Sequence, residues 1–257
     1  MRAIILSAGQ GRRLLPLTEN TPKCCLPLAN HSILEWQLSQ ISQVGIDEVL
    51  VVTGFESERV EAVLVSASKK FANLNIRTLH NPFYARSDNL GTCWVARGEM
   101  LEPFLIINGD TLFEAAILDK LLKSAHDHPI TLTTDSKGDY DDDDMKVVTD
   151  EGRLLRVGKT LDREYVNGES IGMMVFNQQG ADTFRQRVEA LMKSAEGLTR
   201  WYLSAIDELA DEGHVGVCSI QGLSWCEVDD HADLKHAEHV VVAWPEHEGS
   251  AALSASN

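Results

Sequence analysis

Short apolar runs without polar alternation are separated by longer amphipathic segments through the first half of the chain. The clearest runs cover residues 1–6, 48–53 and 104–108. A strand has this composition when both of its faces are buried, as in a parallel sheet covered by helices. The segments 32–44 and 56–71 have the apolar spacing of helices. The sequence therefore predicts an α/β fold with right-handed strand–helix–strand crossovers.

The second half of the chain changes to short strand-like runs between polar turns, a pattern typical of antiparallel strands. Further strands are predicted at 76–79, 130–134, 146–149, 154–157, 172–176, 215–220 and 225–228, and further helices at 89–100, 178–193, 199–211 and 231–240. We expect the last two strands to pair with each other. No linker or repeat divides the chain, so we predict one domain over 1–242 and a flexible tail over 243–257, where small polar residues accumulate.

Charge and composition exclude several classes of partner. The 257 residues carry a net charge of −16, and this argues against nucleic acid, which is bound by clustered Lys and Arg. No apolar stretch approaches the roughly 20 residues of a membrane span. The apolar run at the N-terminus is too short for a secretory signal, so we expect a cytoplasmic protein without a membrane partner. The five cysteines lack C-x-x-C spacing and are predicted to be reduced thiols.

The loop after the first strand is the most informative segment for function. Gly9 and Gly11 follow the strand directly, and such glycines let the backbone approach a ligand and present N–H groups to an anion. Leu14 stands where a dinucleotide-binding motif has its third glycine, and no P-loop sequence is present. The cations Arg12, Arg13 and Lys23 come next. Three cations beside a glycine-rich turn suit a nucleoside triphosphate.

The whole string from Leu6 to Lys23, L-S-A-G-x-G-x-R-L-x-P-L-T-x-x-x-P-K, resembles the signature of the nucleotidyltransferases that activate sugar phosphates and phosphocholine-like alcohol phosphates. Ser7 stands where alanine is usual in that family. The resemblance implies a Rossmann-like, mixed and mainly parallel sheet flanked by helices, the nucleotide-diphospho-sugar transferase type of fold. It also implies that Arg13 and Lys23 are catalytic.

The same resemblance predicts where the nucleotide binds. The expected nucleotide-binding residues are Leu6, Ala8, Gly9, Gly11, Arg12, Asn89 and Asn108. Asn89 belongs to a segment, 81–90, that is similar to the corresponding loop of phosphocholine and related cytidylyltransferases. A role for Asn89 as the N-cap of the following helix is an equal alternative.

Two carboxylates are expected to hold Mg²⁺, which offsets the repulsion between two reacting phosphates. Asp110 follows the buried strand 104–108, at the carboxyl end where ligands of open α/β sheets bind. Asp229 ends the late strand 225–228, and both aspartates match acidic positions of the family. The alternatives are a turn at Asp110 and a helix cap at Asp229 or Asp230, of which Asp230 is the preferred cap.

The acceptor side of the site is predicted from residues in the second half. Lys159 and Glu169 match, by order and spacing, the family's residues for the acceptor phosphate and its organic part, and Lys146 is a further candidate. Gly158 and Thr160 replace the E-K-P surroundings usual in sugar-phosphate members. The acidic run 141–144 has two interpretations that stay open: attraction of a cationic head group, or a solvated loop.

These observations predict a magnesium-dependent nucleotidyltransferase that uses an NTP, with CTP favoured, and a small alcohol phosphate or phosphonate such as phosphocholine. One alternative is a sugar-1-phosphate nucleotidyltransferase that uses UTP, dTTP or GTP. A second alternative is a non-catalytic nucleotide-sensing domain. Assembly into a homo-oligomer is a further expectation.

Overall fold

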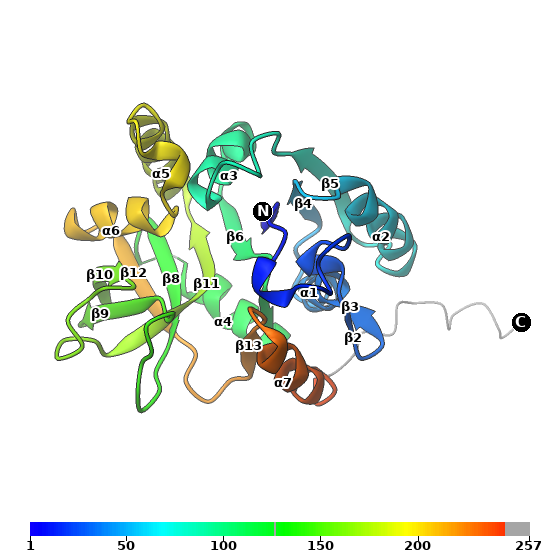
Figure 1. Cartoon of the computed structure of the whole chain (residues 1–257). Helices are drawn as coiled ribbons and strands as arrows, with labels where there is room; N and C mark the ends of the chain where they lie inside the picture. Colours follow the sequence, from blue (N-terminus) through cyan, green and yellow to red (C-terminus); the bar gives the residue numbers. More distant parts are fainter. Residues whose placement is uncertain (126, 245–257) are drawn as a thin grey trace, which may run out of the picture.

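A computed structural model describes residues 1–125 and 127–244. Its helices are α1 (Ile33–Ile41), α2 (Ser57–Lys70), α3 (Asn89–Ala96), α4 (Ala115–Ser124), α5 (Gln178–Met192), α6 (Leu203–Asp211) and α7 (His231–Val241), with 3₁₀ turns η1 (Arg12–Leu14), η2 (Lys23–Cys25), η3 (Arg97–Glu99) and η4 (Gly197–Thr199). Within the described residues, nine strands form one sheet in the order β5-β4-β1-β6-β11-β8-β12-β10-β9 (Figure 1).

The first half of this sheet is parallel, and the second half is largely antiparallel. The strands of the sheet are β1 (Arg2–Ser7), β4 (Glu48–Thr53), β5 (Asn75–His80), β6 (Phe104–Asn108), β8 (Ile130–Asp135), β9 (Lys146–Asp150), β10 (Arg153–Gly158), β11 (Gly168–Phe176) and β12 (Val215–Ser219). Strands β5, β4, β1 and β6 run parallel, and so do β8 and β12. Strand β11 is antiparallel to both β6 and β8. The predicted mixed α/β fold is confirmed, and β4 and β6 have their predicted bounds.

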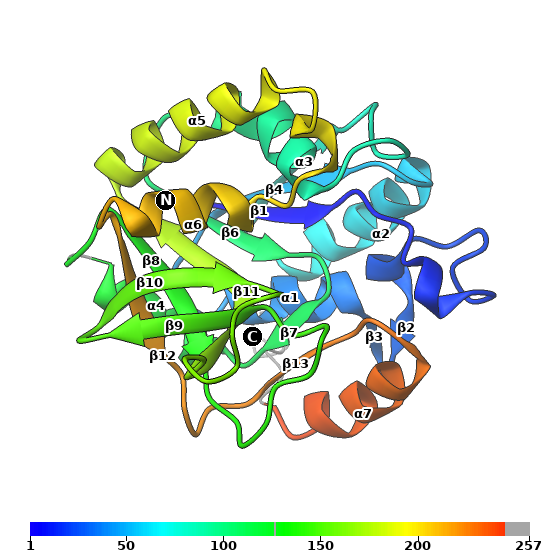
Figure 2. The ribbon, with the colours of Figure 1, turned by 60° about the vertical axis from the view of Figure 1, so that its left-hand side comes forward.

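Helices cover both faces of the sheet (Figures 1 and 2). Ala3 and Ile5 of β1 point to the face covered by α1, α2 and α4, whereas Ile4 points to the face covered by α3, α5 and α6. On the second face, Phe104 stacks on Phe176 with ring centroids 4.3 Å apart. Burial on both faces explains why these strands are apolar without alternation.

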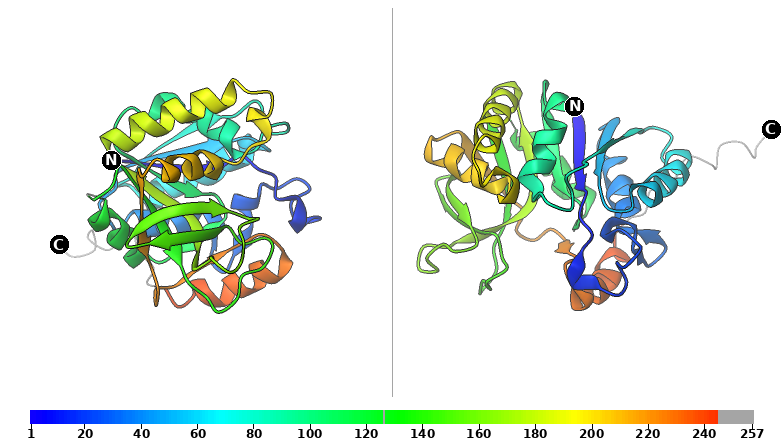
Figure 3. Two further views of the ribbon diagram at one scale, coloured as in Figure 1. Left: turned by 90° about the vertical axis from the view of Figure 1, so that its left-hand side faces the viewer. Right: turned by 45° about the horizontal axis from the view of Figure 1, so that its top comes forward.

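The predicted pairing of 215–220 with 225–228 is wrong. Strand β12 pairs with β8, and β13 (Trp225–Glu227) instead pairs antiparallel with β7 (Thr111–Phe113), outside the main sheet. Strand β7 and the following helix α4 (Ala115–Ser124) were not predicted from the sequence. A second small pair, β2 (Pro27–Leu28) with β3 (His31–Ser32), lies beside α7 (Figure 3).

Trp244 lies just after the predicted domain boundary at residue 242, and it is packed. Its ring meets Trp36 edge to face at 6.4 Å, and its indole N–H donates to Ser224 Oγ at 2.8 Å. The rest of the predicted tail, 245–257, lies outside the described residues.

The five cysteines are free thiols, as predicted. Within residues 1–125 and 127–244, no helix is both long enough and apolar enough to cross a membrane.

Candidate active site

The loop after β1 forms a closed turn at the carboxyl end of the parallel strands. Thr18 Oγ1 donates to the carbonyl of Gly11 at 2.8 Å, and Gln10 Nε2 donates to the carbonyl of Thr18 at 3.1 Å. Gly11 has a φ of +77°, and a Cβ there would lie 2.9 Å from Cβ of Lys23. Glycine is therefore required at this position, both by its backbone conformation and by the close approach of Lys23.

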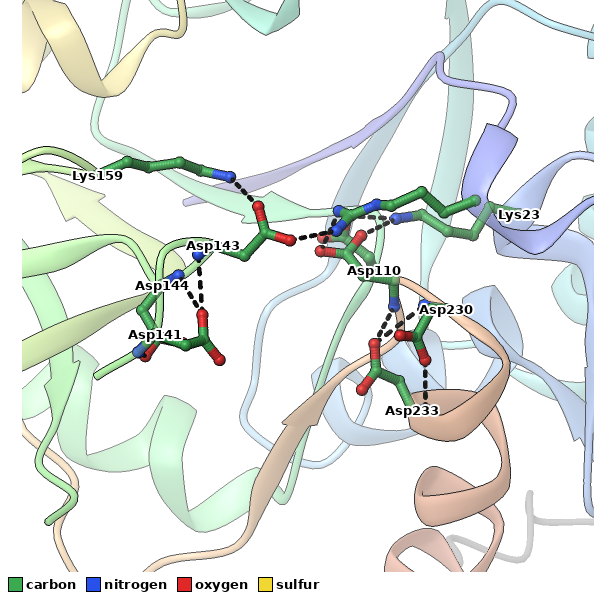
Figure 4. A network of polar contacts seen from close by, with 10 residues as sticks. Lys23, Asp110, Asp141, Asp143, Asp144, Lys159, Asp230 and Asp233 are labelled. Atoms are coloured by element: carbon green, nitrogen blue, oxygen red, sulfur yellow. Dashed lines mark hydrogen bonds and ion pairs between the residues drawn. The ribbon is translucent and has the colours of Figure 1, made fainter. Parts of the chain in front are cut away.

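Asp110 is brought to this loop by the adjacent strand β6. The N–H of Gly109 donates to the carbonyl of Leu6 at 3.0 Å, which joins the ends of β6 and β1. A Cβ on Gly109 would lie 2.6 Å from that carbonyl oxygen. Glycine before the aspartate thus allows the two loops to touch, and the carboxylate of Asp110 points toward the first loop (Figure 4).

Lys23 lies between the two predicted metal-binding aspartates. Its Nζ is 2.6 Å from Asp110 Oδ2 and 2.9 Å from Asp229 Oδ1, and 15% of its side chain is exposed. Burial alone lowers the pKa of Lys23, but the two carboxylates outweigh burial and raise the pKa above its ordinary value. Burial acts to raise the pKa of Asp229, yet Lys23 and Arg13 lower it overall. The Lys23 ammonium and the Asp229 carboxylate are therefore charged at neutral pH.

The two aspartates fit a divalent cation. Asp110 Oδ1 is buried and has no hydrogen-bond partner among the described residues. This carboxylate oxygen could therefore bind a cation. Magnesium is commonly bound by one or two carboxylates, with water and substrate phosphates completing its octahedron. No group of three or more His, Cys, Asp or Glu side chains suited to a metal occurs in the described residues, so such a cation would depend on the substrate for further ligands.

The cap of α7 fixes the position of Asp229. Asp230 accepts from the N–H groups of Ala232 and Asp233, so it is the N-cap, as preferred from the sequence. Asp233 Oδ2 in turn accepts from the N–H of Asp229 at 2.9 Å. Asp229 therefore keeps its carboxylate free for Lys23 and for Arg13, whose guanidinium lies 2.7 Å away.

A cavity of about 210 Å³ opens beside these charges. It is lined by most of the predicted nucleotide-binding residues, namely Leu6, Ala8, Gly9, Gly11, Asn89 and Asn108. The remaining one, Arg12, lines a neighbouring cavity of about 630 Å³, and Tyr84, Ser87 and Asp88 line both. The two cavities together offer an extended site with polar walls beside the cations.

Two asparagines of the first cavity are held by Tyr202, the residue before α6. Asn89 Oδ1 accepts from the N–H of Tyr202 at 2.8 Å, and the Tyr202 hydroxyl donates to Asn108 Oδ1 at 3.0 Å. The alternative that Asn89 caps α3 is wrong, because Asp88 is the N-cap and accepts from the N–H of Asn89. Among the described residues, neither amide nitrogen has a hydrogen-bond partner.

The predicted acceptor residues approach the site from β9, β10 and β11. Lys159 Nζ lies 5.0 Å over the ring of Trp201 and 3.3 Å from Asp143 Oδ1. Lys146 differs from the prediction: its side chain is 1% exposed, and Nζ donates to the carbonyls of Lys159 and Asp144. Because its donors are directed at backbone oxygens, Lys146 is placed to position the two segments rather than to touch an acceptor.

Glu169 is buried beneath the acidic loop, with Lys137 Nζ 3.0 Å from Oε2 and 7% of its side chain exposed. Desolvation raises the pKa of Glu169 to about 7; Lys137 opposes this rise, and Asp144 adds to it. A carboxyl whose pKa is raised on folding favours the native state when protonated. Its contribution to the free energy of unfolding is therefore present at low pH and is lost as the pH rises to about 7.

This gives a prediction for Glu169→Gln. The variant should match the wild type near pH 4 and exceed it near pH 8 by about 1 to 3 kcal/mol, because glutamine does not become charged. Urea unfolding at a series of pH values measures the difference. Glu164→Gln, at an exposed position in the same segment, is the control and should give a constant difference. A constant difference for Glu169→Gln as well would contradict the raised pKa.

Two ionisable residues of the site, Glu227 and Lys137, were not predicted from the sequence. Glu227 lies two residues before Asp229, a spacing that places both on one face of a strand, and this was a usable signal. Desolvation, together with the charges of Asp110 and Asp229, raises the pKa of Glu227 to about 8. Lys137 lies in a loop without periodicity, so no pattern pointed to it, whereas Asp143 was considered only as a member of the acidic run 141–144.

Two curated relatives match almost the whole of this chain. A protein from Aquifex aeolicus, named "Bifunctional IPC transferase and DIPP synthase", is 28% identical over 93% of this chain and 51% of its own length. A "CMP-5'-(3-aminopropyl)phosphonate synthase" from Streptomyces rubellomurinus is 28% identical over 93% of this chain and 38% of its own length. The chain thus spans about half or less of these two relatives.

One solved structure is similar to this chain over almost the full length of both proteins. The CTP:phosphocholine cytidylyltransferase from Streptococcus pneumoniae superposes with a TM-score of 0.75 over 93% of this chain and 98% of its own, at 21% identity, and so shares the fold. The family model of the MobA-like NTP transferase domain matches residues 3–211. The chain therefore belongs to the family of MobA-like NTP transferase domains.

Proposed function

We propose that this nucleotidyltransferase transfers CMP from CTP to the phosphate or phosphonate of a small alcohol-type acceptor and releases pyrophosphate. The observation that carries this proposal is the meeting of Lys23, Asp110 and Asp229 beside the glycine turn. These groups come from three distant parts of the chain, and cations and carboxylates beside a glycine-rich turn together suit a metal-bound triphosphate.

The preference for CTP and a small acceptor rests on the relatives. The Streptomyces relative is named for a CMP-phosphonate product, and the Streptococcus structure for CTP and phosphocholine. Both acceptors carry a phosphorus group on a short chain that ends in a cationic nitrogen. The replacement of the E-K-P surroundings by Gly158 and Thr160 is the sequence feature that favours such an acceptor over a sugar 1-phosphate.

In the proposed reaction, an oxygen of the acceptor phosphate attacks the α-phosphorus of CTP. The bond from that phosphorus to the oxygen bridging to the β-phosphorus breaks, and pyrophosphate leaves. Magnesium held by Asp110 and Asp229 would supply charge neutralisation between the two phosphates. Arg13 and Lys23 stabilise the charge that develops on the leaving pyrophosphate. No general base is needed, because the acceptor phosphate is already ionised near neutral pH.

The remaining residues position the reactants. Gly9, Gly11, Asn89 and Asn108 line the cavity, where the glycine backbone and the two amide side chains would donate to the nucleotide. Lys159 holds the acceptor phosphate from the opposite side, and Lys146 fixes the backbone that carries Lys159. Catalysis on this account is mainly orientation and electrostatics.

A pyrophosphate-release screen tests the proposal. The four ribonucleoside triphosphates and dTTP are each combined with one acceptor, in the presence of Mg²⁺ or of EDTA. The acceptors are phosphocholine, 3-aminopropylphosphonate, inositol 1-phosphate and hexose 1-phosphates. We expect turnover with CTP and a small acceptor in the presence of Mg²⁺ only. Turnover confined to a hexose 1-phosphate would replace the proposal by the sugar alternative. Binding of a nucleotide without turnover of any pair would favour a nucleotide-sensing domain.

A further inference from the structure

Asp143 joins the two cations that the proposed function assigns to the two substrates. Its Oδ2 lies 2.9 Å from a guanidinium nitrogen of Arg13, and its Oδ1 lies 3.3 Å from Lys159 Nζ. Arg13 belongs to the loop after β1, and Lys159 follows β10, so a single carboxylate connects opposite sides of the site (Figure 4). The Asp143 side chain makes both contacts while 70% of it is exposed.

The loop that carries Asp143 has a defined conformation. Asp141 Oδ1 accepts from the N–H groups of Asp143 and Asp144, and Asp144 Oδ2 accepts from the N–H of Asp141. Lys137 Nζ pairs with Asp144 Oδ1 at 2.8 Å, and Lys146 Nζ reaches the Asp144 carbonyl. Asp141 and Asp144 therefore shape the loop from within. This arrangement leaves the Asp143 side chain directed at the cations.

The neighbouring Asp142 shows that position in the loop, and not charge alone, determines these contacts. Its side chain is fully exposed and pairs with Arg163, away from Arg13. The two adjacent aspartates thus have the same charge and the same loop but different partners. The acidic run is neither a uniform solvated segment nor a uniform negative surface.

The Asp143 carboxylate pairs with the N–H donors of Arg13 and Lys159. The proposed function assigns these same donors to the phosphate groups of the substrates. We propose that Asp143 is an intramolecular substitute for substrate phosphate, which closes the site across Arg13 and Lys159 before substrates bind and is displaced when they enter. This inference rests on the proposed function, because it uses the triphosphate as the ligand of Arg13. Arg13 keeps its second ion pair, with Asp229 at 2.7 Å, so displacement of Asp143 leaves the guanidinium aimed at the site.

The closed arrangement lowers the apparent affinity for the triphosphate. A ligand that binds only the open form has its dissociation constant multiplied by the inverse of the open fraction. Two exposed ion pairs together favour the closed form by a factor of roughly 2 to 30. We therefore expect removal of the Asp143 charge to tighten triphosphate binding by about five-fold.

The test compares Asp143→Asn with Asp142→Asn in the full chain. Both variants remove one negative charge from the same loop, so the long-range effect on an anion is matched. The probe is inorganic tripolyphosphate with Mg²⁺, measured by titration calorimetry, because its binding requires neither the base nor the acceptor. We expect Asp143→Asn to lower the dissociation constant about five-fold and Asp142→Asn to change it less than about two-fold.

Ionic strength supplies a second readout that a merely structural role of Asp143 would not change. Salt screens exposed ion pairs, so the ratio between wild type and Asp143→Asn should fall toward one between about 0.05 and 0.5 M salt. Weaker binding by Asp143→Asn, or equal effects of the two variants, would overturn the inference while leaving the proposed function intact. Failure of the wild type to bind tripolyphosphate or CTP at all would instead remove the proposed function and this inference together.

Discussion

Asp110→Asn is expected to lower turnover by about a thousand-fold or more while the protein remains folded. Asp110 Oδ2 contacts Lys23, and its buried Oδ1 has no hydrogen-bond partner. Asparagine preserves the size of the side chain but removes the negative charge and replaces one oxygen by an NH₂ group. That group cannot bind a cation, and it would face the Lys23 ammonium, so the variant would disturb both the proposed metal site and the position of Lys23.

Pyrophosphate release under saturating substrates measures this loss, and thermal unfolding shows whether the fold survives. Asp119→Asn is a matched control, because Asp119 is an exposed residue of α4 that pairs with Lys123. The control should keep wild-type turnover. Near-normal turnover in Asp110→Asn would contradict the assignment of Asp110 as a metal ligand.

Lys23→Met should produce the second largest effect, a loss of about a hundred- to a thousand-fold in turnover. Methionine has a similar length but no charge, so the carboxylates of Asp110 and Asp229 would face each other without their shared ammonium. We expect the metal-free variant to unfold at a lower temperature than the wild type. Added Mg²⁺ should raise its unfolding temperature more than that of the wild type, because the cation relieves the repulsion.

The comparison variant is Lys123→Met, whose side chain is 75% exposed on α4. It should show neither the loss of turnover nor the enhanced response to Mg²⁺. Equal Mg²⁺ responses of Lys23→Met and the wild type would show that the two carboxylates do not bind a cation together. The thermal readout therefore tests the cation site even in a variant without turnover.

The sequence predicted the parts of the site that depend on neighbouring parallel strands. Asp110 follows β6 and Gly11 follows β1, and the carboxyl ends of adjacent parallel strands meet at one edge of the sheet. Asp229 was predicted by resemblance, but the pairing that brings it there was not. Strand β13 pairs with β7, so that Val228 donates to the carbonyl of Asp110 at 3.1 Å. Two strands of three residues, far apart in the chain, carry too little periodicity to predict such a pairing.

The orientations of the lysine side chains on the acceptor side could not be predicted from the sequence either. Lys146 and Lys159 are both lysines near predicted strand ends, yet only Lys159 reaches the ion pairs of the site, since Lys146 is buried against backbone carbonyls. The two lysines lie at the end of the β9–β10 pair where Lys146 is opposite Gly158, and the register of this pair shifts between Leu154 and Arg156. Residue type and approximate element bounds do not determine that register.

Strand β13 lies near the C-terminal end of the chain, and this has a consequence for folding during translation. Lys23 and Asp229 are 206 residues apart in the chain, so a nascent polypeptide emerging from the ribosome exposes its glycine turn and Lys23 long before Asp229 is synthesised. Strands β1, β4, β5 and β6 can associate during that interval, but the partner of β7 is still missing. A bound metal–triphosphate complex can therefore stabilise the fold only after β13 has been synthesised.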